Sequence, residues 1–319
     1  MAKKVNFSLT QLEYVLAVHK YGHFSLAAKA CHITQPTLSM QIQKLEEELE
    51  TVIFDRTKKP ILLTEKGAKL IEQMRIVLLE ARKVEAILQT ESGNEIRGEL
   101  TLGIIPTVAP YLLPRLLPVI AKNYPELRLK ILELQTHRIV QSLEDDQIDL
   151  GILATPLNLP KIHEQSLYWE IFSVLCQKSH KIAQKNKVKY SNLEFDDIWL
   201  LEEGHCLRNQ VLDICAHRQK KNSKRQFQFE SGSLETLKSL VKSYGGYTLL
   251  PALATEGLPS GVNLVPFESP VPAREIGLAT GRQQYKKNLH EALAKAVLEA
   301  IPESVRKIKK KDLELVPVE

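Results

Sequence analysis

Two cysteines nine residues apart are the residues of this chain best suited to reversible redox chemistry. Cys206 stands in the run Gly204-His205-Cys206-Leu207-Arg208, and Cys215 follows it. The thiolate is the reactive form of cysteine, and the start of a helix together with basic neighbours favours it, so we expect Cys206 to react with peroxides. Oxidation of Cys206 to a sulfenic acid and attack by Cys215 would make the pair a reversible switch.

The spacing of this pair sets a condition on the switch. In a continuous helix over residues 206–215, the two sulfurs would lie about 13 Å apart along the axis and on opposite faces. A disulfide requires Cα atoms within about 7 Å of each other. Local unfolding must therefore precede disulfide formation. The residues alone leave open the alternative that both cysteines are small members of a hydrophobic core.

The remaining residues offer little other chemistry. Cys31 lies in an alanine-rich helix and Cys176 ends an apolar strand, so we expect both to be packing residues. The nine histidines show no metal-ligand spacing, and no Cys-x-x-Cys motif occurs, so we predict that no metal is bound. A glycine-rich phosphate loop and a nucleophile elbow are also missing, which predicts that the protein uses no cofactor and is not an enzyme.

Composition places the chain among folded proteins of several domains. It has 319 residues, of which 44% are hydrophobic and 25% charged, so disordered and collagen-like classes are excluded. The net charge of +5 permits an anionic partner. No apolar run approaches the ~20 residues of a membrane span, and no secretory signal is recognisable, so we expect a cytoplasmic protein without membrane contact.

The first 64 residues are predicted to form a helical unit with a basic hairpin. Ser8, Ser25 and Thr34 are expected to cap three successive helices. Two short strands at residues 52–54 and 61–63 then enclose a basic tip at residues 56–60. A short turn before a helix with a small polar face suits the major groove of DNA, with the hairpin on the backbone. An ordinary three-helix bundle remains the alternative.

A long helix capped by Thr64 follows, and residues 65–95 are predicted to be a linker that pairs two subunits. Its apolar positions alternate in spacings of four and three, as in a coiled-coil seam. These positions are Leu70, Met74, Val77, Ala81, Val84 and Leu88. A polar joint near residue 93 ends the pattern, so we place the main domain boundary at about residue 95.

Residues 96–319 are predicted to form a two-lobed α/β domain with a ligand cleft. Strands at 100–105, 128–134 and 149–153 alternate with helices at 112–123 and 138–145, which favours a parallel sheet. A second unit has strands at 173–176, 198–201 and 226–229 and helices near Arg208 and Leu234. A strand at 274–280 and a helix at 288–300 then return to the first. Lobe I comprises about 96–168 plus 275–305 and lobe II about 169–274, while residues 306–311 are expected to be a solvated basic tail.

These motifs resemble a known family. The runs Phe24 to Ala30, Thr34 to Ser39 and Gln41 to Glu46 look like the winged helix-turn-helix of LysR-type transcriptional regulators, over residues 6–66. The long helix and the two lobes, of the periplasmic-binding-protein type, resemble the rest of that family. The resemblance implies that DNA is contacted by Thr34, Gln35, Pro36, Thr37, Ser39, Gln43, Arg56, Lys58 and Lys59. Met40 stands where many members have Arg or Gly.

The redox segment is similar to that of the peroxide-sensing branch of this family. The similarity rests on Glu203 to Arg208, on the Cys215 spacing and on matching runs such as Gln135 to His137. It implies that Cys206 is peroxidatic and Cys215 resolving. The implied pocket contains Thr107, Thr136, His205, Arg208, Asn209 and Arg274. Asn209 stands where the pattern usually has Asp, and we expect Asn209→Asp to speed peroxide consumption if this position relays a proton.

The resemblance also implies the partners. They are double-stranded DNA with a two-part operator, a second copy of the chain in a homodimer and homotetramer, RNA polymerase, hydrogen peroxide, and thiol reductants such as glutaredoxin or thioredoxin. The implied function is a bacterial activator of oxidative-stress genes. Three alternatives are a LysR-type regulator that responds to a small molecule in the cleft without redox chemistry, a thiol peroxidase with turnover, and a solute-binding protein.

Overall fold

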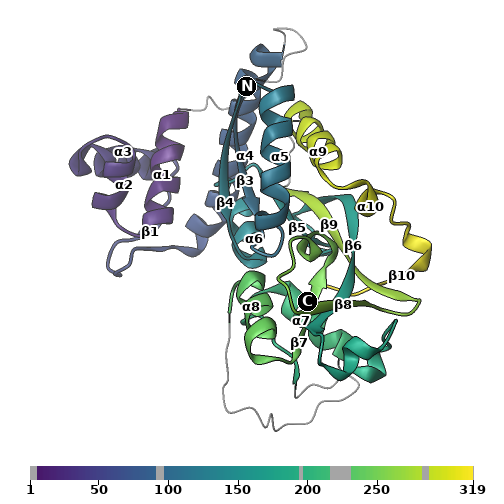
Figure 1. The fold of residues 1–319 in the computed structure, drawn as a ribbon. Coiled ribbons are helices and arrows are strands. Elements are labelled where there is room, and N and C mark those ends of the chain that lie inside the picture. The colour runs from purple at the N-terminus through teal and green to yellow at the C-terminus, as the bar shows by residue number, and fades with distance from the viewer. Residues whose placement is uncertain (1–5, 91–96, 194–196, 216–230, 282–286, 319) are drawn as a thin grey trace. The chain divides into compact units, whose positions relative to one another are not determined.

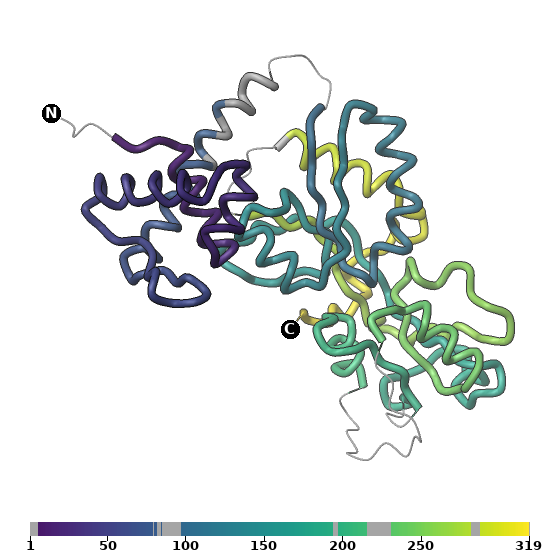
Figure 2. The backbone as a smooth tube through the Cα atoms, turned by 90° about the vertical axis from the view of Figure 1, so that its left-hand side faces the viewer, coloured from purple at the N-terminus to yellow at the C-terminus, as the bar shows by residue number. Residues whose placement is uncertain are grey.

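A computed structural model describes residues 6–90, 97–193, 197–215, 231–281 and 287–318 (Figures 1 and 2). The chain divides into two compact units, Met1–Gly93 and Asn94–Glu319. No helix in the described ranges is long and apolar enough to cross a membrane.

Three short helices form the first unit: α1 (Leu9–Tyr21), α2 (Phe24–Ala30) and α3 (Gln35–Glu48). Ser8 forms a capping box with Gln11, and Thr34 caps α3, both as predicted. The prediction that Ser25 caps α2 is wrong, because α2 begins at Phe24 with His23 at its N-cap. Gly22 closes α1 with a φ of 64°, so that only Gly22 and His23 separate the two helices.

A short hairpin and a long helix complete this unit. β1 (Phe54–Asp55) pairs antiparallel with β2 (Leu62–Leu63), close to the predicted strands but shorter. The hydroxyl oxygen of Thr64 accepts a hydrogen bond of 2.9 Å from the backbone N–H of Gly67 and so caps α4 (Glu65–Thr90), as predicted. On α4, Ile71, Met74 and Leu78 are buried in the core of the unit. Of the predicted seam, Met74 thus faces its own core, whereas Val84 is 63% exposed.

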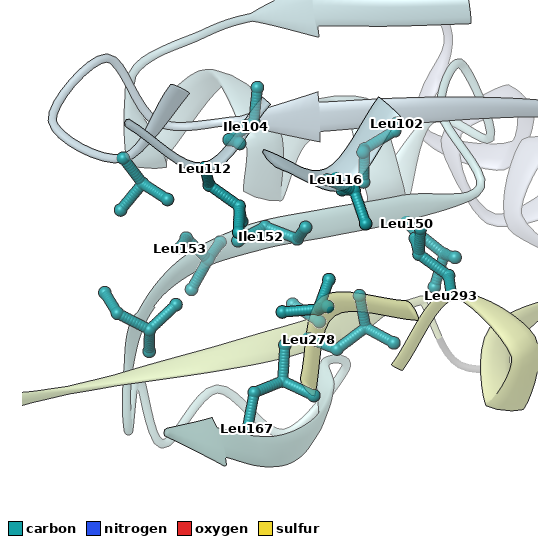
Figure 3. Close-up of a cluster of buried hydrophobic side chains, with 14 of the residues drawn as sticks. Leu102, Ile104, Leu112, Leu116, Leu150, Ile152, Leu153, Leu167, Leu278 and Leu293 are labelled. Carbon is teal, nitrogen blue, oxygen red and sulfur yellow. The ribbon is translucent and has the colours of Figure 1, made fainter. Parts of the chain in front are cut away.

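The second unit begins with the predicted parallel sheet. β3 (Gly98–Ile104) pairs in parallel with β4 (Leu127–Glu133) and with β5 (Leu150–Thr155). The connections are α5 (Ala109–Asn123) and α6 (Thr136–Glu144). Leucine and isoleucine side chains from these strands, from α5 and from α9 (Lys287–Ala300) fill the core of lobe I (Figure 3).

Two long strands continue through both lobes. β6 (His163–Gln177) and β9 (Val271–Thr280) pair antiparallel, and β9 also pairs with β5. The end of β6 pairs with β7 (Tyr247–Pro251) and β8 (Val262–Pro266), around which a second core forms with α7 (Cys206–Cys215) and α8 (Leu234–Tyr244). Figure 1 shows these last elements together in lobe II. Short 3-10 turns η1 (Lys181–Gln184), η2 (Tyr190–Asn192) and η5 (Ala252–Thr255) link them.

The structure corrects several predictions for lobe II and for the C-terminus. Residues 198–201 form isolated bridges to Tyr247 and Ser231 instead of a strand, and residues 226–229 lie outside the described ranges. The predicted solvated tail is not an end. After α10 (Glu303–Arg306) and η6 (Lys310–Asp312), the chain returns as β10 (Leu313–Leu315), parallel to β9. The lysine side chains of residues 307–311 are exposed to solvent. The strand that follows them, β10, is the third strand that pairs with β9, after β5 and β6.

Candidate redox site and nucleic-acid interface

α7 begins at Cys206, two residues after a glycine in the preceding turn. Gly204 has a φ of 91°, and a Cβ atom there would lie only 3.0 Å from the side-chain oxygen of Gln135. Glycine therefore lets this turn pack closely against the start of α6. Cys206 occupies the first position of α7, so its sulfur lies at the N-terminal end of the helix.

The Cys206 thiol bridges the two lobes. Its sulfur donates a hydrogen bond of 3.2 Å to the hydroxyl oxygen of Thr136, the first residue of α6 in lobe I. Both residues line a small cavity. The cavity is lined by Ile105, Pro106, Thr107, Gln135, Thr136, Ala154, Gly204, His205, Cys206, Leu207 and Arg274. The cavity volume is about 10 Å³, which leaves room for about one water-sized molecule.

A buried arginine supplies positive charge to this cavity. Arg274 on β9 is fully buried and donates to the Thr107 hydroxyl oxygen at 2.9 Å and to the Thr107 carbonyl oxygen at 3.2 Å. Its Nε donates at 2.8 Å to Glu170, also fully buried on β6. The second carboxylate oxygen of Glu170 accepts from the backbone N–H of Leu253 at 3.0 Å. Pairing and hydrogen bonding offset the cost of burying both charges and hold the guanidinium in one orientation.

Three predicted pocket residues next to Cys206 differ in their position. His205 is 6% exposed, lines the cavity, and has its Nε2 3.6 Å from a carboxylate oxygen of Glu202. Arg208 instead donates at 2.7 Å to the carbonyl oxygen of Leu201. Of the described residues, neither Arg208 nor Asn209 is among those that line the cavity. The cavity lining therefore does not include these two predicted pocket residues, and the guanidinium of Arg208 is engaged by Leu201 instead.

The second cysteine of the pair lies at the far end of α7. Residues 206–215 form one continuous helix, and both thiols are free, so the condition derived from the spacing applies. Burial raises the pKa of the Cys215 thiol to about 12, although a hydrogen bond with Tyr247 acts in the opposite direction. Cys215 is therefore a protonated member of the lobe II core and must leave that core before it can attack Cys206.

The other two cysteines have surroundings typical of packing residues. Burial, helped by the charge of Glu13, raises the pKa of Cys31, and burial raises that of Cys176 to about 11. Groups of three or more residues able to hold a metal ion do not occur in the part of the chain that the structure describes.

α3 presents the predicted DNA-binding residues on one surface. Thr34, Gln35, Pro36, Thr37 and Gln43 are exposed, and Ser39 is half-buried. The hydroxyl groups of Thr34 and Thr37 are 2.8 Å apart, and the Gln43 amide donates to Glu47 at 3.2 Å. Met40, which is 60% exposed, adds an apolar side chain to this polar surface.

The hairpin is attached to α3 by a charged group whose role the sequence did not reveal. Glu46 accepts hydrogen bonds from the backbone N–H groups of Ile53 at 2.7 Å and Phe54 at 3.2 Å. Its other oxygen accepts from Arg56 at 2.8 Å, and the Arg56 guanidinium lies 5.2 Å from the centre of the Phe24 ring. Arg56 therefore holds the hairpin in place, while Lys58 and Lys59 at its tip are exposed.

Glu170 is the main site residue that sequence reasoning missed. A signal exists in the run Trp169-Glu170-Ile171-Phe172, because a carboxylate within an apolar strand must find a buried partner. Gln135 was also missed, although it stands in a run that supports the family resemblance and lines the cavity.

A helix-turn-helix unit, a long helix and a two-lobed α/β domain together define a transcriptional regulator of a known class. The family model described as "Bacterial regulatory helix-turn-helix protein, lysR family" matches residues 9–68. The model described as "LysR substrate binding domain" matches residues 93–302, more than half of the chain. The chain belongs to the LysR family.

Within this family, the chain is similar to curated proteins and to solved structures along most of its length. The chain is 36% identical over 296 residues to the "Hydrogen peroxide-inducible genes activator" of Haemophilus influenzae, covering 92% of this chain and 97% of the relative. It is 36% identical over 292 residues to the "DNA-binding transcriptional dual regulator OxyR" of Escherichia coli, covering 91% and 94%. A full-length OxyR variant from Pseudomonas aeruginosa has a TM-score of 0.75 at 32% identity, with 93% of this chain and 99% of that chain covered.

Proposed function

We propose that this protein is a DNA-binding transcriptional regulator that senses hydrogen peroxide through a reversible Cys206–Cys215 disulfide and controls oxidative-stress genes. The observation that carries the proposal is the Cys206 thiol on the wall of a small cavity, hydrogen-bonded to Thr136, with the guanidinium of Arg274 on the same wall. The names of the similar proteins support the same oxidant. The chain acts as a regulator, not as an enzyme, and uses no cofactor.

The first step is peroxide reduction by Cys206. The thiolate attacks one oxygen of hydrogen peroxide, a sulfur–oxygen bond forms and the O–O bond breaks, which leaves a sulfenic acid. The second oxygen departs as hydroxide and takes up a proton to become water. Arg274 stabilises the charge on this leaving oxygen, and the hydroxyl groups of Thr107 and Thr136 donate to and accept from the peroxide. His205 completes the wall of the pocket.

The second step forms the disulfide. The Cys215 thiolate attacks the Cys206 sulfur, the sulfur–sulfur bond forms, and the hydroxyl group of the sulfenic acid leaves as a second molecule of water after it takes up a proton. Hydrogen peroxide and two thiols thus give one disulfide and two waters. Thiol–disulfide exchange with glutaredoxin or thioredoxin restores the thiols. Because α7 must unwind in this step, the change in shape is coupled to the redox state.

The size of the cavity distinguishes hydrogen peroxide from larger effectors. Room for about one water-sized molecule excludes an organic metabolite from this cavity in this conformation, whereas hydrogen peroxide exceeds that room by only one oxygen atom. A LysR-type regulator that binds a metabolite in its cleft would require a more open site between the lobes.

The output of the switch is DNA binding by an oligomer. In this proposal residues 1–64 bind DNA, residues 65–95 pair two subunits through α4, and residues 96–319 assemble dimers into a homotetramer on a two-part operator. The exposed α3 residues read the major groove, and Lys58 and Lys59 contact the backbone. The altered assembly recruits RNA polymerase in the bacterial cytoplasm.

Thiol counting tests the proposal directly. The reduced protein is treated with about one equivalent of hydrogen peroxide, free thiols are counted, and disulfides are mapped by mass spectrometry. We expect two thiols to disappear as a Cys206–Cys215 bridge, and Cys206→Ser and Cys215→Ser to prevent the bridge. Survival of all four thiols would refute the redox proposal and leave a regulator that responds to a ligand.

A further inference from the structure

A strand near the C-terminus lies beside the redox site without any role in the proposed chemistry. We call residues Leu313–Val316 the C-terminal strap. Its β10 residues pair in parallel with Val271–Ala273 of β9, and the backbone N–H of Val316 donates to the carbonyl oxygen of Ala273 at 2.9 Å. The next residue of β9 is Arg274. The strap therefore ends against the backbone that positions the pocket arginine.

The same strap is bonded to the redox helix. Gln210 in the middle of α7 is fully buried, and its amide nitrogen donates to the carbonyl oxygen of Val316 at 3.1 Å. The Val316 side chain is 8% exposed and packs in the core that contains Leu207 and Cys215. Gln210 lies four residues after Cys206 and five before Cys215. The bond thus fixes the segment that must unwind for the two sulfurs to meet.

Gln210 is weakly satisfied for a buried amide. The side-chain oxygen of Gln210 has no hydrogen-bond partner among the residues that the structure describes. Among those residues, the side-chain amide is therefore hydrogen-bonded to Val316 through its nitrogen. A buried amide with a single hydrogen bond stabilises the helix only while that bond lasts. The strap and α7 are therefore joined by one hydrogen bond, from Gln210 to Val316, whose loss would free this part of the helix.

A third contact holds the strap from the other side. The hydroxyl group of Tyr190 in η2 donates to a carboxylate oxygen of Glu314 at 2.6 Å. Glu314 and Tyr190 belong neither to α7 nor to the cavity wall. They offer a way to loosen the strap without changing the redox helix.

We propose that the C-terminal strap holds α7 in its helical, reduced form through Gln210 and must release it before Cys215 reaches Cys206. Gln210 is then a positioning residue for the disulfide step, and this inference rests on the proposed function. Release also unpairs Val271–Ala273 beside Arg274. Unwinding of α7 is thereby transmitted to β9, which runs through both lobes.

Rate measurements on three variants of the full-length reduced protein test this role. Rapid mixing with hydrogen peroxide separates formation of the Cys206 sulfenic acid from closure of the disulfide. Gln210→Met keeps the length and burial of the side chain but removes its donor, so closure should become about five- to tenfold faster, as for the loss of one buried hydrogen bond, with the first step unchanged. Tyr190→Phe should accelerate closure by a smaller factor.

Lys307→Gln is the matched control, because it breaks an exposed ion pair of 2.6 Å with Glu303 on α10, away from the strap. Neither rate should change in this variant. Circular dichroism confirms that each reduced variant keeps its helices. Unchanged or slower closure in folded Gln210→Met overturns the inference.

Hydrogen exchange tests strap release in the unaltered sequence. We expect the backbone N–H of Val316 to be protected in the reduced protein and to exchange at least about tenfold faster in the disulfide form. If a disulfide forms while this protection stays the same, the strap inference fails and the proposed function stands. If no disulfide forms, both fail.

Discussion

The sulfur of Cys206 lies 3.2 Å from the hydroxyl oxygen of Thr136, although 70 residues separate them in the sequence. Each is the first residue of its helix, α7 and α6 respectively. Two helices therefore begin at the cavity and direct the positive ends of their dipoles toward it, beside the buried charge of Arg274. This arrangement would stabilise the negative charge on the hydroxide that leaves during peroxide reduction.

The Thr136 hydroxyl should contribute to the rate of the first step. Thr136→Val keeps the shape of the side chain but removes the partner of the Cys206 sulfur, so we expect sulfenic acid formation to slow about tenfold. Rapid mixing of a Cys215→Ser background with hydrogen peroxide isolates this step. The Thr136→Ser variant retains the hydroxyl, so sulfenic acid should form in it nearly as fast as in the protein with the original threonine. Slowing in Thr136→Ser but not in Thr136→Val would show that the methyl group, not the hydroxyl, matters.

The buried ion pair between Glu170 and Arg274 should contribute to stability as well as to positioning. Glu170→Gln leaves the guanidinium without a counter-charge, so the free energy of unfolding should fall by about 3 kcal/mol. Denaturant unfolding of the reduced protein measures this. The double variant Glu170→Gln with Arg274→Met removes the orphaned charge and should recover part of the loss. A drop of less than about 0.5 kcal/mol in the single variant would contradict the assigned role.

The raised pKa of Cys215 predicts a loss of stability at alkaline pH. An unfolded thiol ionises near the ordinary value of 9.0, whereas the folded thiol keeps its proton to about 12. Between these values the unfolded state binds fewer protons, so stability falls as pH rises, by up to about 1.4 kcal/mol per pH unit.

Unfolding of the reduced protein from pH 8 to 11 is the measurement, with Cys215→Ala as the comparison. The variant lacks this thiol while all other titrating groups are shared, so its stability should decline less steeply. Parallel declines in the two proteins would mean that burial does not hold the Cys215 proton.

Local signals in the sequence predicted much of the fold. The caps at Ser8, Thr34 and Thr64 depend on hydrogen bonds within three residues, and the strand–helix alternation of lobe I depends on local periodicity. The prediction of a cap at Ser25 failed because α2 already begins at Phe24, so Ser25 lies inside the helix. The lengths of β6 and β9 and the return of β10 arise from pairing between distant segments, which no local pattern reports.

Part of the candidate site was likewise predictable from local sequence, and part depends on contacts between distant segments. The cysteine pair and its need to unwind follow from residue types and spacing, whereas Thr107, Thr136 and Arg274 came only from the family resemblance. The ion pair with Glu170 and the bond between Gln210 and Val316 link residues more than 100 positions apart. Such contacts become visible only when the strands are placed side by side.

The structure changes the expectation for Asn209. The sequence predicts that Asn209→Asp speeds peroxide consumption, but this residue is not among those that line the cavity. We now expect sulfenic acid formation in this variant to stay within about twofold of the original rate. Rapid mixing in the Cys215→Ser background measures it, and Cys206→Ser provides the baseline. A tenfold acceleration would mean that α7 turns Asn209 toward the pocket when peroxide binds.

The hairpin lysines should supply phosphate contacts, whereas Arg56 should act on the hairpin itself. Lys59→Met removes an exposed charge at the tip, so binding to operator DNA should weaken and the slope of log affinity against log salt should decrease by about one. Arg56→Met breaks the contacts with Glu46 and Phe24, so it should lower the stability of the first unit. Fluorescence anisotropy at four salt concentrations gives the slopes, and Lys307→Gln serves as the control for charge alone. An unchanged slope in Lys59→Met would place the hairpin tip away from the DNA, and the polar surface of α3 would then have to provide the phosphate contacts.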